Sequence, residues 1–198
     1  MYTLIIVLLL FLASPSLCVA GWFQDQEAAI AAINGASAPA PTYVCIGYEG
    51  VTCTLSSTPP NAYVGSADAS YARSWTATEN GTLNRVALFF NTTWAVTTQK
   101  VVVYDSGRNI IATGAITQAA GWVWSSTLVA EAGHSLDFAT NDVLYFGISI
   151  DSAGTYNIMR TDNTGNQWNL DPGYLQDPAD AWTSYNHNMA AQLEYAQR

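Results

Sequence analysis

Basic side chains are scarce in this sequence. Six lysines and arginines stand against 15 aspartates and glutamates in 198 residues, which gives a formal net charge of −9. Nucleic acids and anionic lipid surfaces attract proteins mainly through clustered Lys and Arg side chains. The charge balance therefore argues against nucleic acid and against an anionic membrane surface as partners.

Motifs of known catalytic chemistry are also missing. The sequence contains no G-x-S-x-G nucleophile elbow, no two-histidine metal motif, no phosphate-binding loop and no dinucleotide fingerprint. The two histidines, His134 and His187, lie in segments with turn composition, where we expect ordinary exposed side chains. We therefore predict no catalytic residue from a motif.

Paired carboxylates are the remaining route to an enzyme, because a glycoside hydrolase needs two carboxyl groups about 5–9.5 Å apart. Three pairs can be considered: Glu131 with Asp137, Asp151 with Asp162, and Asp177 with Asp180. None lies in a strand-centred pattern, and Asp in turns commonly bonds to nearby backbone. Glycoside hydrolysis is therefore kept only as a second alternative.

A hydrophobic run long enough to cross a bilayer is absent after residue 20. The apolar stretch over residues 4–13 is followed by Ser14-Pro15-Ser16 and then Cys18-Val19-Ala20, an order typical of a cleavable secretory signal. The stretch is shorter than the ~20 residues of a membrane span. No Lys or Arg precedes it, so a retained anchor stays an alternative. We predict cleavage before Gly21 and a secreted, extracellular protein without a stable membrane span.

Cysteine occurs at three positions. Cys18 falls within the predicted signal, which leaves Cys45 and Cys53 on either side of a Gly-containing turn. In an oxidising compartment such a pair indicates a local disulfide. A zinc site would need further ligands, and no His or other Cys lies nearby in the sequence. We therefore predict a Cys45–Cys53 disulfide.

The segment after the signal predicts one short helix over residues 22–34, with Asp25 as its cap and an Ala-rich body that ends at Asn34-Gly35. A linker of Pro and small residues follows over 36–41 and leads into the cysteine loop. The predicted organisation is a signal over 1–20, then helix, linker and disulfide loop over 21–61, and a β-sandwich domain over 62–198.

The rest of the chain alternates with period two. In residues 143–151 the apolar side chains Leu144, Phe146, Ile148 and Ile150 share one face, which is the pattern of a half-buried strand. Further strands are predicted over 71–78, 82–90, 100–104, 110–114, 122–129, 156–161 and 188–195. Turn sequences suited to β-hairpins separate them at 79–81, 105–109 and 151–154. Short strands with such turns predict an all-β fold of two packed antiparallel sheets.

The run over residues 100–107, with Thr113-Gly114, Gly121-Trp122 and residues 144–148, resembles the jelly-roll modules of extracellular microbial and phage proteins, including carbohydrate-binding modules. The resemblance covers about residues 70–195. It implies an antiparallel, two-sheet jelly-roll sandwich, and its motifs are turns and core positions rather than chemistry. The predicted N-terminal helix and disulfide loop have no counterpart in it.

Residues 162–187 are long for a connection inside a compact domain, and such loops are usually functional or disordered. The segment mixes aromatic rings with amide and carboxylate groups, a combination that suits the apolar face and hydroxyl rim of a sugar. The predicted ligand-binding residues are Trp168, Tyr174, Trp182, Tyr185, Asn166 and Asp171. The alternative is that these aromatics cover an open end of the sandwich.

Two smaller expectations concern metal and core. Asp151, Asp162 and Asn163 could supply oxygen ligands to Ca²⁺, although no EF-hand spacing is present. Trp122 and Trp124 share one face of a strand opposite Val123, and we expect the tryptophan face to be the buried one.

The leading hypothesis is a secreted, non-catalytic module that binds a glycan or a cell-surface polymer, or mediates adhesion, through residues 162–187. The alternative is a structural subunit of an extracellular filament, coat or matrix, in which copies of the chain bind one another through edge strands or the N-terminal helix.

Overall fold

The computed structural model describes residues 40–47, 53, 55, 61–65, 69–90, 99–117, 119–151, 156–161, 168–171, 174–179, 183–185 and 188–198. The chain divides into two units, Met1–Ala40 and Pro41–Arg198, and all the strands belong to the second. The predicted signal and the predicted helix over 22–34 lie outside the described residues. Within these residues, no helix has the length and apolar composition to cross a membrane.

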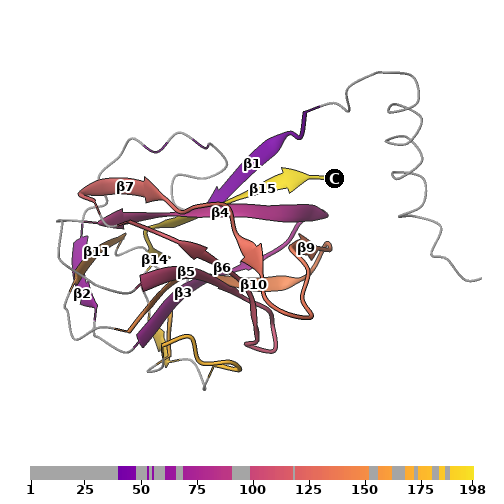
Figure 1. The fold of residues 1–198 in the computed structure, drawn as a ribbon. Coiled ribbons are helices and arrows are strands. Elements are labelled where there is room, and N and C mark those ends of the chain that lie inside the picture. Colours follow the sequence, from indigo (N-terminus) through magenta and orange to yellow (C-terminus); the bar gives the residue numbers. More distant parts are fainter. Residues whose placement is uncertain are drawn as a thin grey trace, which may run out of the picture. The chain divides into compact units, whose positions relative to one another are not determined.

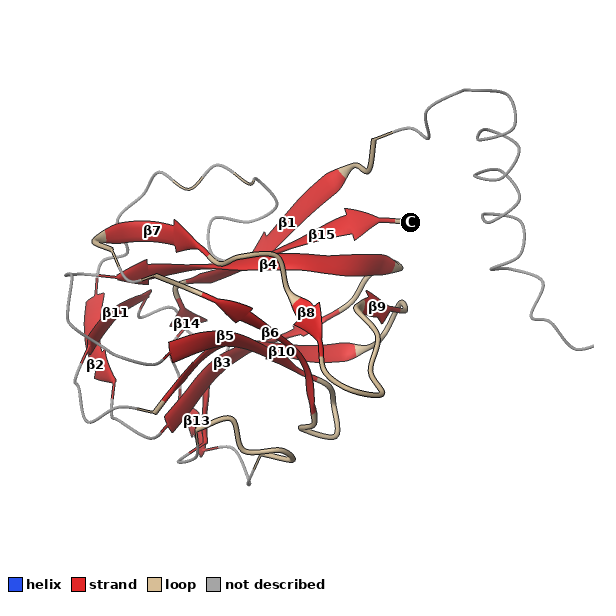
Figure 2. Ribbon diagram, viewed as in Figure 1, coloured by secondary structure: helices blue, strands red, loops and turns tan. Residues whose placement is uncertain are grey.

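The described strands form two antiparallel sheets, which confirms the all-β prediction (Figure 2). The first sheet contains β1 (Tyr43–Gly47), β15 (Ala191–Gln197), β4 (Gly81–Phe90), β11 (Tyr156–Thr161) and β14 (Asn188–Met189), with β2 (Asn61–Gly65), β7 (Gly121–Trp124) and β9 (Asp137–Phe138) paired beside them. The second runs in the order β13 (Thr183–Tyr185), β12 (Trp168–Asp171), β3 (Ala69–Thr76), β10 (Val143–Ile150), β5 (Gln99–Tyr104), β6 (Ile110–Ala115) and β8 (Val129–Ala130).

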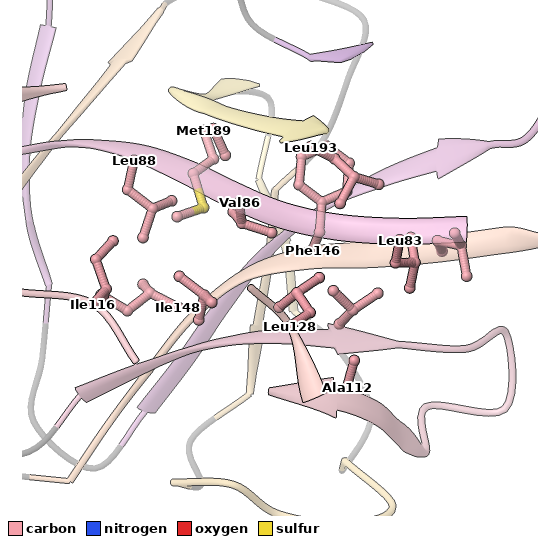
Figure 3. Close-up of a cluster of buried hydrophobic side chains, with 14 of the residues drawn as sticks. Leu83, Val86, Leu88, Ala112, Ile116, Leu128, Phe146, Ile148, Met189 and Leu193 are labelled. Carbon is pink, nitrogen blue, oxygen red and sulfur yellow. The ribbon is translucent and has the colours of Figure 1, made fainter. Parts of the chain in front are cut away.

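The core lies between the two sheets, with β4 and β15 on one side and β3, β5 and β10 on the other (Figure 1). The inward row predicted on β10 is confirmed, because Leu144, Phe146, Ile148 and Ile150 all belong to the main buried cluster. The last strands contribute a second predicted row, Met189, Ala191, Leu193 and Tyr195. Figure 3 shows how side chains from the two sheets meet in this cluster.

The outward faces of the central strands differ from the expectation of a solvated exterior. Gln192 and Glu194 on β15 and Ser149 on β10 are buried, although each alternates with a core residue. At these positions each sheet is therefore covered on its outer side as well as on its inner side. Period-two alternation identifies which side chains face the partner sheet, but it does not say whether the other face meets water or more protein.

The expectation for Trp122 and Trp124 is wrong. Val123 packs against the core, whereas both tryptophans lie on the outer side of the first sheet and are half-buried. Trp122 packs edge-to-face on Phe89 with ring centroids 5.5 Å apart, and the Arg85 guanidinium lies 4.5 Å from the centroid of the Trp124 ring. Contacts with Phe89 and Arg85 thus partly cover the two tryptophan rings, which do not belong to the main core cluster.

Strand β1 joins the disulfide loop to the first sheet. It pairs with β15 from Tyr43 opposite Ala196 to Gly47 opposite Gln192. The predicted disulfide between Cys45 and Cys53 is present, with a Cα–Cα distance of 5.2 Å. Residues 43–47 are therefore part of the sandwich rather than only a connection that leads to it.

One of the predicted hairpins is confirmed and another is not. The turn over residues 105–109 joins β5 to β6, and the Arg108 N–H donates to the Asp105 carbonyl at 3.0 Å. Residues 79–81 instead lead from β3 in the second sheet to β4 in the first. This connection crosses between layers, because the inward faces of β3 and β4 both contribute to the same core.

We predict that Phe146→Ala lowers the free energy of unfolding by about 3–5 kcal/mol, because it leaves a cavity between the two sheets. Phe146 has no exposed surface and belongs to the main cluster. Urea denaturation followed by tryptophan fluorescence measures the change. Thr127→Ala, at an exposed position, serves as the control and should change stability by no more than about 0.5 kcal/mol.

Candidate functional site

The predicted aromatic segment is described in three pieces. The first two pieces are β12 and β13, which extend the second sheet beyond β3. Trp168 is the first residue of β12, and its backbone lies opposite Arg73 of β3 and Tyr185 of β13. Asp171 closes β12 opposite Ser70. The third piece is residues 174–179, which include Tyr174. Asn166 and Trp182 lie outside the described residues, as do Asp162 and Asn163 of the predicted calcium site.

Residues 174–179, which we call the cover segment, pack on the outer face of the second sheet. Leu175 and Ala179 join a small apolar cluster there, together with Val102, Tyr104, Ile110 and Tyr145. In the outer row of β10, Gly147 and Ser149 are buried and Tyr145, which packs against this cluster, is half-buried. Leu175 and Ala179 thus cover part of the outer face of the second sheet. The two roles predicted for the aromatic residues, glycan binding and closure of an open end of the sandwich, stay predictions.

A buried chain of hydroxyl groups lies beneath the cover segment. The Tyr104 hydroxyl donates to Ser70 Oγ at 3.1 Å, and Ser70 Oγ donates to Ser149 Oγ at 2.8 Å. Ser149 Oγ also accepts the backbone N–H of Leu175 at 2.8 Å. Buried polar groups are stable only when bonded, so this chain fixes the cover segment in place as well as satisfying the two serines.

Tyr174 and Asp151 lie at the other end of the cover segment. Burial raises the pKa of the Tyr174 phenol, and the nearby Asp151 carboxylate raises it further. Asp151 itself is exposed. A neutral phenol beside a carboxylate can take part in hydrogen bonds with a ligand. The calcium site predicted around Asp151 stays a prediction, because Asp162 and Asn163 lie outside the described residues.

A hollow of about 330 Å³ opens at one end of the sandwich, where three turns meet. Its floor is apolar and comes from Ile111, Phe138, Val143 and Leu144. Its rim is polar and carries Asp105, Ser106, His134, Ser135, Asp137 and Asp142. The volume lies at the lower end of the range of roughly 300–1,000 Å³ seen for small-molecule sites. We call this feature the end hollow.

Each rim carboxylate is held in a defined orientation. Asp105 accepts the backbone N–H and the side-chain amide of Asn109 at 2.9 and 3.1 Å. Asp137 accepts the Thr82 hydroxyl at 2.8 Å and pairs with Arg198 at 2.9 Å. Asp142 accepts the Ala139 N–H at 2.8 Å. Because a carboxylate has about four acceptor positions, each of the three retains capacity for a ligand.

His134 is exposed on the rim between these carboxylates. Its backbone N–H donates to the Glu131 carbonyl at 3.0 Å, which closes the turn that carries it. Within the described part of the chain, no recorded hydrogen bond joins His134 to Ser106 or Ser135. The imidazole and the hydroxyl groups of Ser106 and Ser135 can donate hydrogen bonds to a ligand and accept them from it.

The end hollow and the cover segment share one turn. Asp105 and Ser106 line the hollow, and at the other end of the same turn the Arg108 carbonyl accepts the Ala179 N–H at 2.8 Å. The Asp177 carboxylate accepts the N–H of Ile110 at 3.0 Å. The predicted binding segment is thus attached to the wall of the hollow, although Tyr174 is not among the residues that line it.

A second cavity of about 200 Å³ lies beside Arg73 and Trp75 of β3 and Ile46 and Gly47 of β1. Arg73 lies on the same inward face of β3 as the core residues Tyr71 and Trp75, opposite Phe146 of β10, and is buried. Burial lowers the pKa of the Arg73 guanidinium to about 10. The guanidinium nevertheless remains charged at neutral pH, so this cavity is cationic whereas the end hollow is acidic.

Comparison of the chain with family models, with curated proteins and with solved structures finds no match.

The end hollow was not predicted from the sequence. His134 was expected to be an ordinary exposed turn residue, and Asp105 was assigned only to the hairpin turn over residues 105–109. Their turns are separate in sequence, and pairing between strands brings the turns to one end of the sandwich. The available signal was the concentration of Asp, Ser and His in turns that follow strands, which is also the composition of ordinary turns.

We predict that Ser149→Ala lowers the free energy of unfolding by about 1–3 kcal/mol, because the Leu175 N–H then loses its acceptor in a buried setting. Hydrogen exchange should show faster exchange of the Leu175 amide, and urea denaturation measures the stability. Ser126→Ala makes the same chemical change at an exposed serine that accepts the Ala115 N–H, so its cost should stay below about 1 kcal/mol. An equal effect of the two changes would contradict the role assigned to Ser149.

Proposed function

We propose that this protein is an exported, non-catalytic binding module that holds a carbohydrate in the end hollow. The observation that carries the proposal is the composition of the hollow, with an apolar floor, three carboxylates held by hydrogen bonds, and hydroxyl and imidazole groups beside them. A sugar ring presents one apolar face and a rim of hydroxyls. Such a ligand can contact the floor while its hydroxyl groups bond to the rim.

Charge narrows the class of ligand. Three carboxylates line the end hollow, and the Arg198 side chain pairs with one of them. An anionic ligand would meet repulsion there, whereas a neutral hydroxylated ligand donates hydrogen bonds to carboxylates, and bonds to charged acceptors are the stronger kind. The proposed ligand is therefore a neutral glycan rather than a uronic acid or a sulfated sugar.

The cover segment extends the proposed site. Asp177 and Ala179 bond to the turn that forms one wall of the hollow. The predicted contacts of Trp168, Trp182 and Tyr185 with further units of a glycan chain are part of the same proposal.

The finer fold assignment belongs to the same proposal. We place the sandwich among jelly-roll modules similar to carbohydrate-binding modules, because its connections pass between sheets, as from β3 to β4 and from β10 to β11. The disulfide is consistent with an oxidising environment, and export follows from the signal-like residues 1–20.

A second candidate, a structural subunit, is favoured by the edge strands. Tyr43 on β1 and Val129 on β8 are large apolar residues with exposures of 48% and 67%, and each lies on an outermost strand of its sheet. Exposed edges with apolar side chains are sites for pairing with another chain. Electron microscopy of the purified protein separates the two candidates, since filaments indicate the subunit and single particles the module.

We predict that an array of neutral oligosaccharides identifies a ligand and that His134→Ala weakens its binding about tenfold, the loss expected for roughly 1.4 kcal/mol of hydrogen bonding. Ser106→Trp should abolish binding by filling the hollow. Titration calorimetry measures both. Lys100→Ala, at the far end of β5 from the turn at 105–109, is the control and should bind as the wild type does.

Two results would contradict the proposal. Undiminished binding by Ser106→Trp would move the site away from the end hollow. Turnover of the bound glycan, lost on changing a single rim carboxylate, would instead make the protein a hydrolase.

A further inference from the structure

The cavity beside Arg73, which we call the Arg73 cavity, lies between a strand of each sheet. Its described lining comes from Ile46 and Gly47 of β1 in the first sheet and from residues 73–76 of β3 in the second. Its volume of about 200 Å³ is below the roughly 300–1,000 Å³ of most small-molecule sites. A space of this size admits a small ion or the charged end of a larger molecule.

Arg73 brings a positive charge to this cavity. It lies on the inward face of β3, and only 8% of its surface is exposed. Burial lowers the pKa of the guanidinium to about 10, so the group stays charged at neutral pH. No Asp or Glu is among the described residues that line the cavity. Because a buried charge is costly unless it is compensated, an anion in the cavity stabilises this guanidinium.

The shape of the guanidinium suits an oxyanion. An arginine side chain carries five N–H donors in a planar fork, and two of them match two oxygens of a carboxylate or phosphate group. Arg73 also interacts with other groups of the protein. Five donors are enough for such an interaction and for an anion at the same time.

The edge of β3 adds main-chain donors beside Arg73. β12 pairs with β3 from Ser70 as far as Arg73, and the described pairing of these two strands ends there. The Ala77 N–H donates to the Asp142 carbonyl at 2.8 Å, on the side of β10. Because successive N–H groups of a strand point to alternate sides, those of Ser74 and Thr76 point away from β10, toward the side on which β12 has ended.

We propose that the Arg73 cavity is a binding site for a small oxyanion, a phosphate or carboxylate group held by the Arg73 guanidinium and by main-chain N–H groups at the edge of β3. Trp75 and Ile46 give the site an apolar wall. The Trp75 ring stacks on Tyr195 and meets Phe138 edge-on, with ring centroids 5.4 Å apart in each case. These contacts hold the wall in position before a ligand binds.

The test is thermal unfolding of the full chain in rising concentrations of sodium phosphate and, separately, of sodium acetate, with sodium chloride keeping the ionic strength constant. We expect the unfolding midpoint of the wild type to rise along a saturable curve, because a ligand that binds only the native state stabilises it. A response to phosphate alone identifies a tetrahedral anion, and a response to acetate alone identifies a carboxylate.

Arg73→Met should weaken the apparent affinity for the anion at least about tenfold, the loss expected for one charge-assisted hydrogen bond. Lys100→Met removes an equal charge from a half-buried residue outside the described lining of the cavity. This control should respond to the anion as the wild type does.

Two results would overturn the proposal: a wild type that responds to neither anion, or an Arg73→Met variant that responds as strongly as the wild type. If Arg73→Met does not fold, NMR of the wild type decides. The anion should shift the signals of the Arg73 Nε–H and of the Ser74 and Thr76 amides, while the Val129 amide stays in place. An unchanged Arg73 signal would contradict the site. None of these results bears on the glycan proposal, because Arg73 does not line the end hollow.

Discussion

The contact between the inner faces of the two sheets is the interaction on which the other features depend. Leu83, Val86 and Leu88 from the first sheet meet Phe146 and Ile148 from the second in one continuous cluster. Removing this apolar surface from water is the main favourable contribution to folding such a domain. The same packing brings three turns to one end of the sandwich, and the end hollow exists only because those turns are held there.

A β-bulge in β4 allows core residues to face inward while polar residues beside them contact Glu194 on the outer side of the sheet. The register of β4 with β15 shifts between Glu194 and Tyr195, so that Glu194 lies opposite Arg85 and Tyr195 opposite Leu83. Asn84 is the additional residue, and bulges of this kind redirect side chains. Leu83 and Val86 therefore both face the core although three positions separate them, and Asn84 and Arg85 both reach Glu194.

The sequence was sufficient where local rules decide the structure. Alternation identified the inward row of β10, and two cysteines around a short turn identified the disulfide. The opposite face of β10 could not be predicted, because Ser149 is buried by Leu175, which is distant in the chain. The predicted orientation of Trp122 and Trp124 was wrong for the same reason, because the residues that contact these rings, Phe89 and Arg85, belong to a different strand. Strands over 43–47, 61–65 and 168–171 were missed.

The turn over residues 105–109 has a consequence for binding energetics. Its backbone is fixed by the Asp105 carboxylate from within and by Asp177 and Ala179 from the cover segment. A ligand that enters the end hollow therefore meets a wall that was ordered during folding, and it bears little of the entropy cost of arranging that wall. Preorganisation of this kind lowers the cost of binding, so a ligand needs fewer contacts with this wall to reach a given affinity.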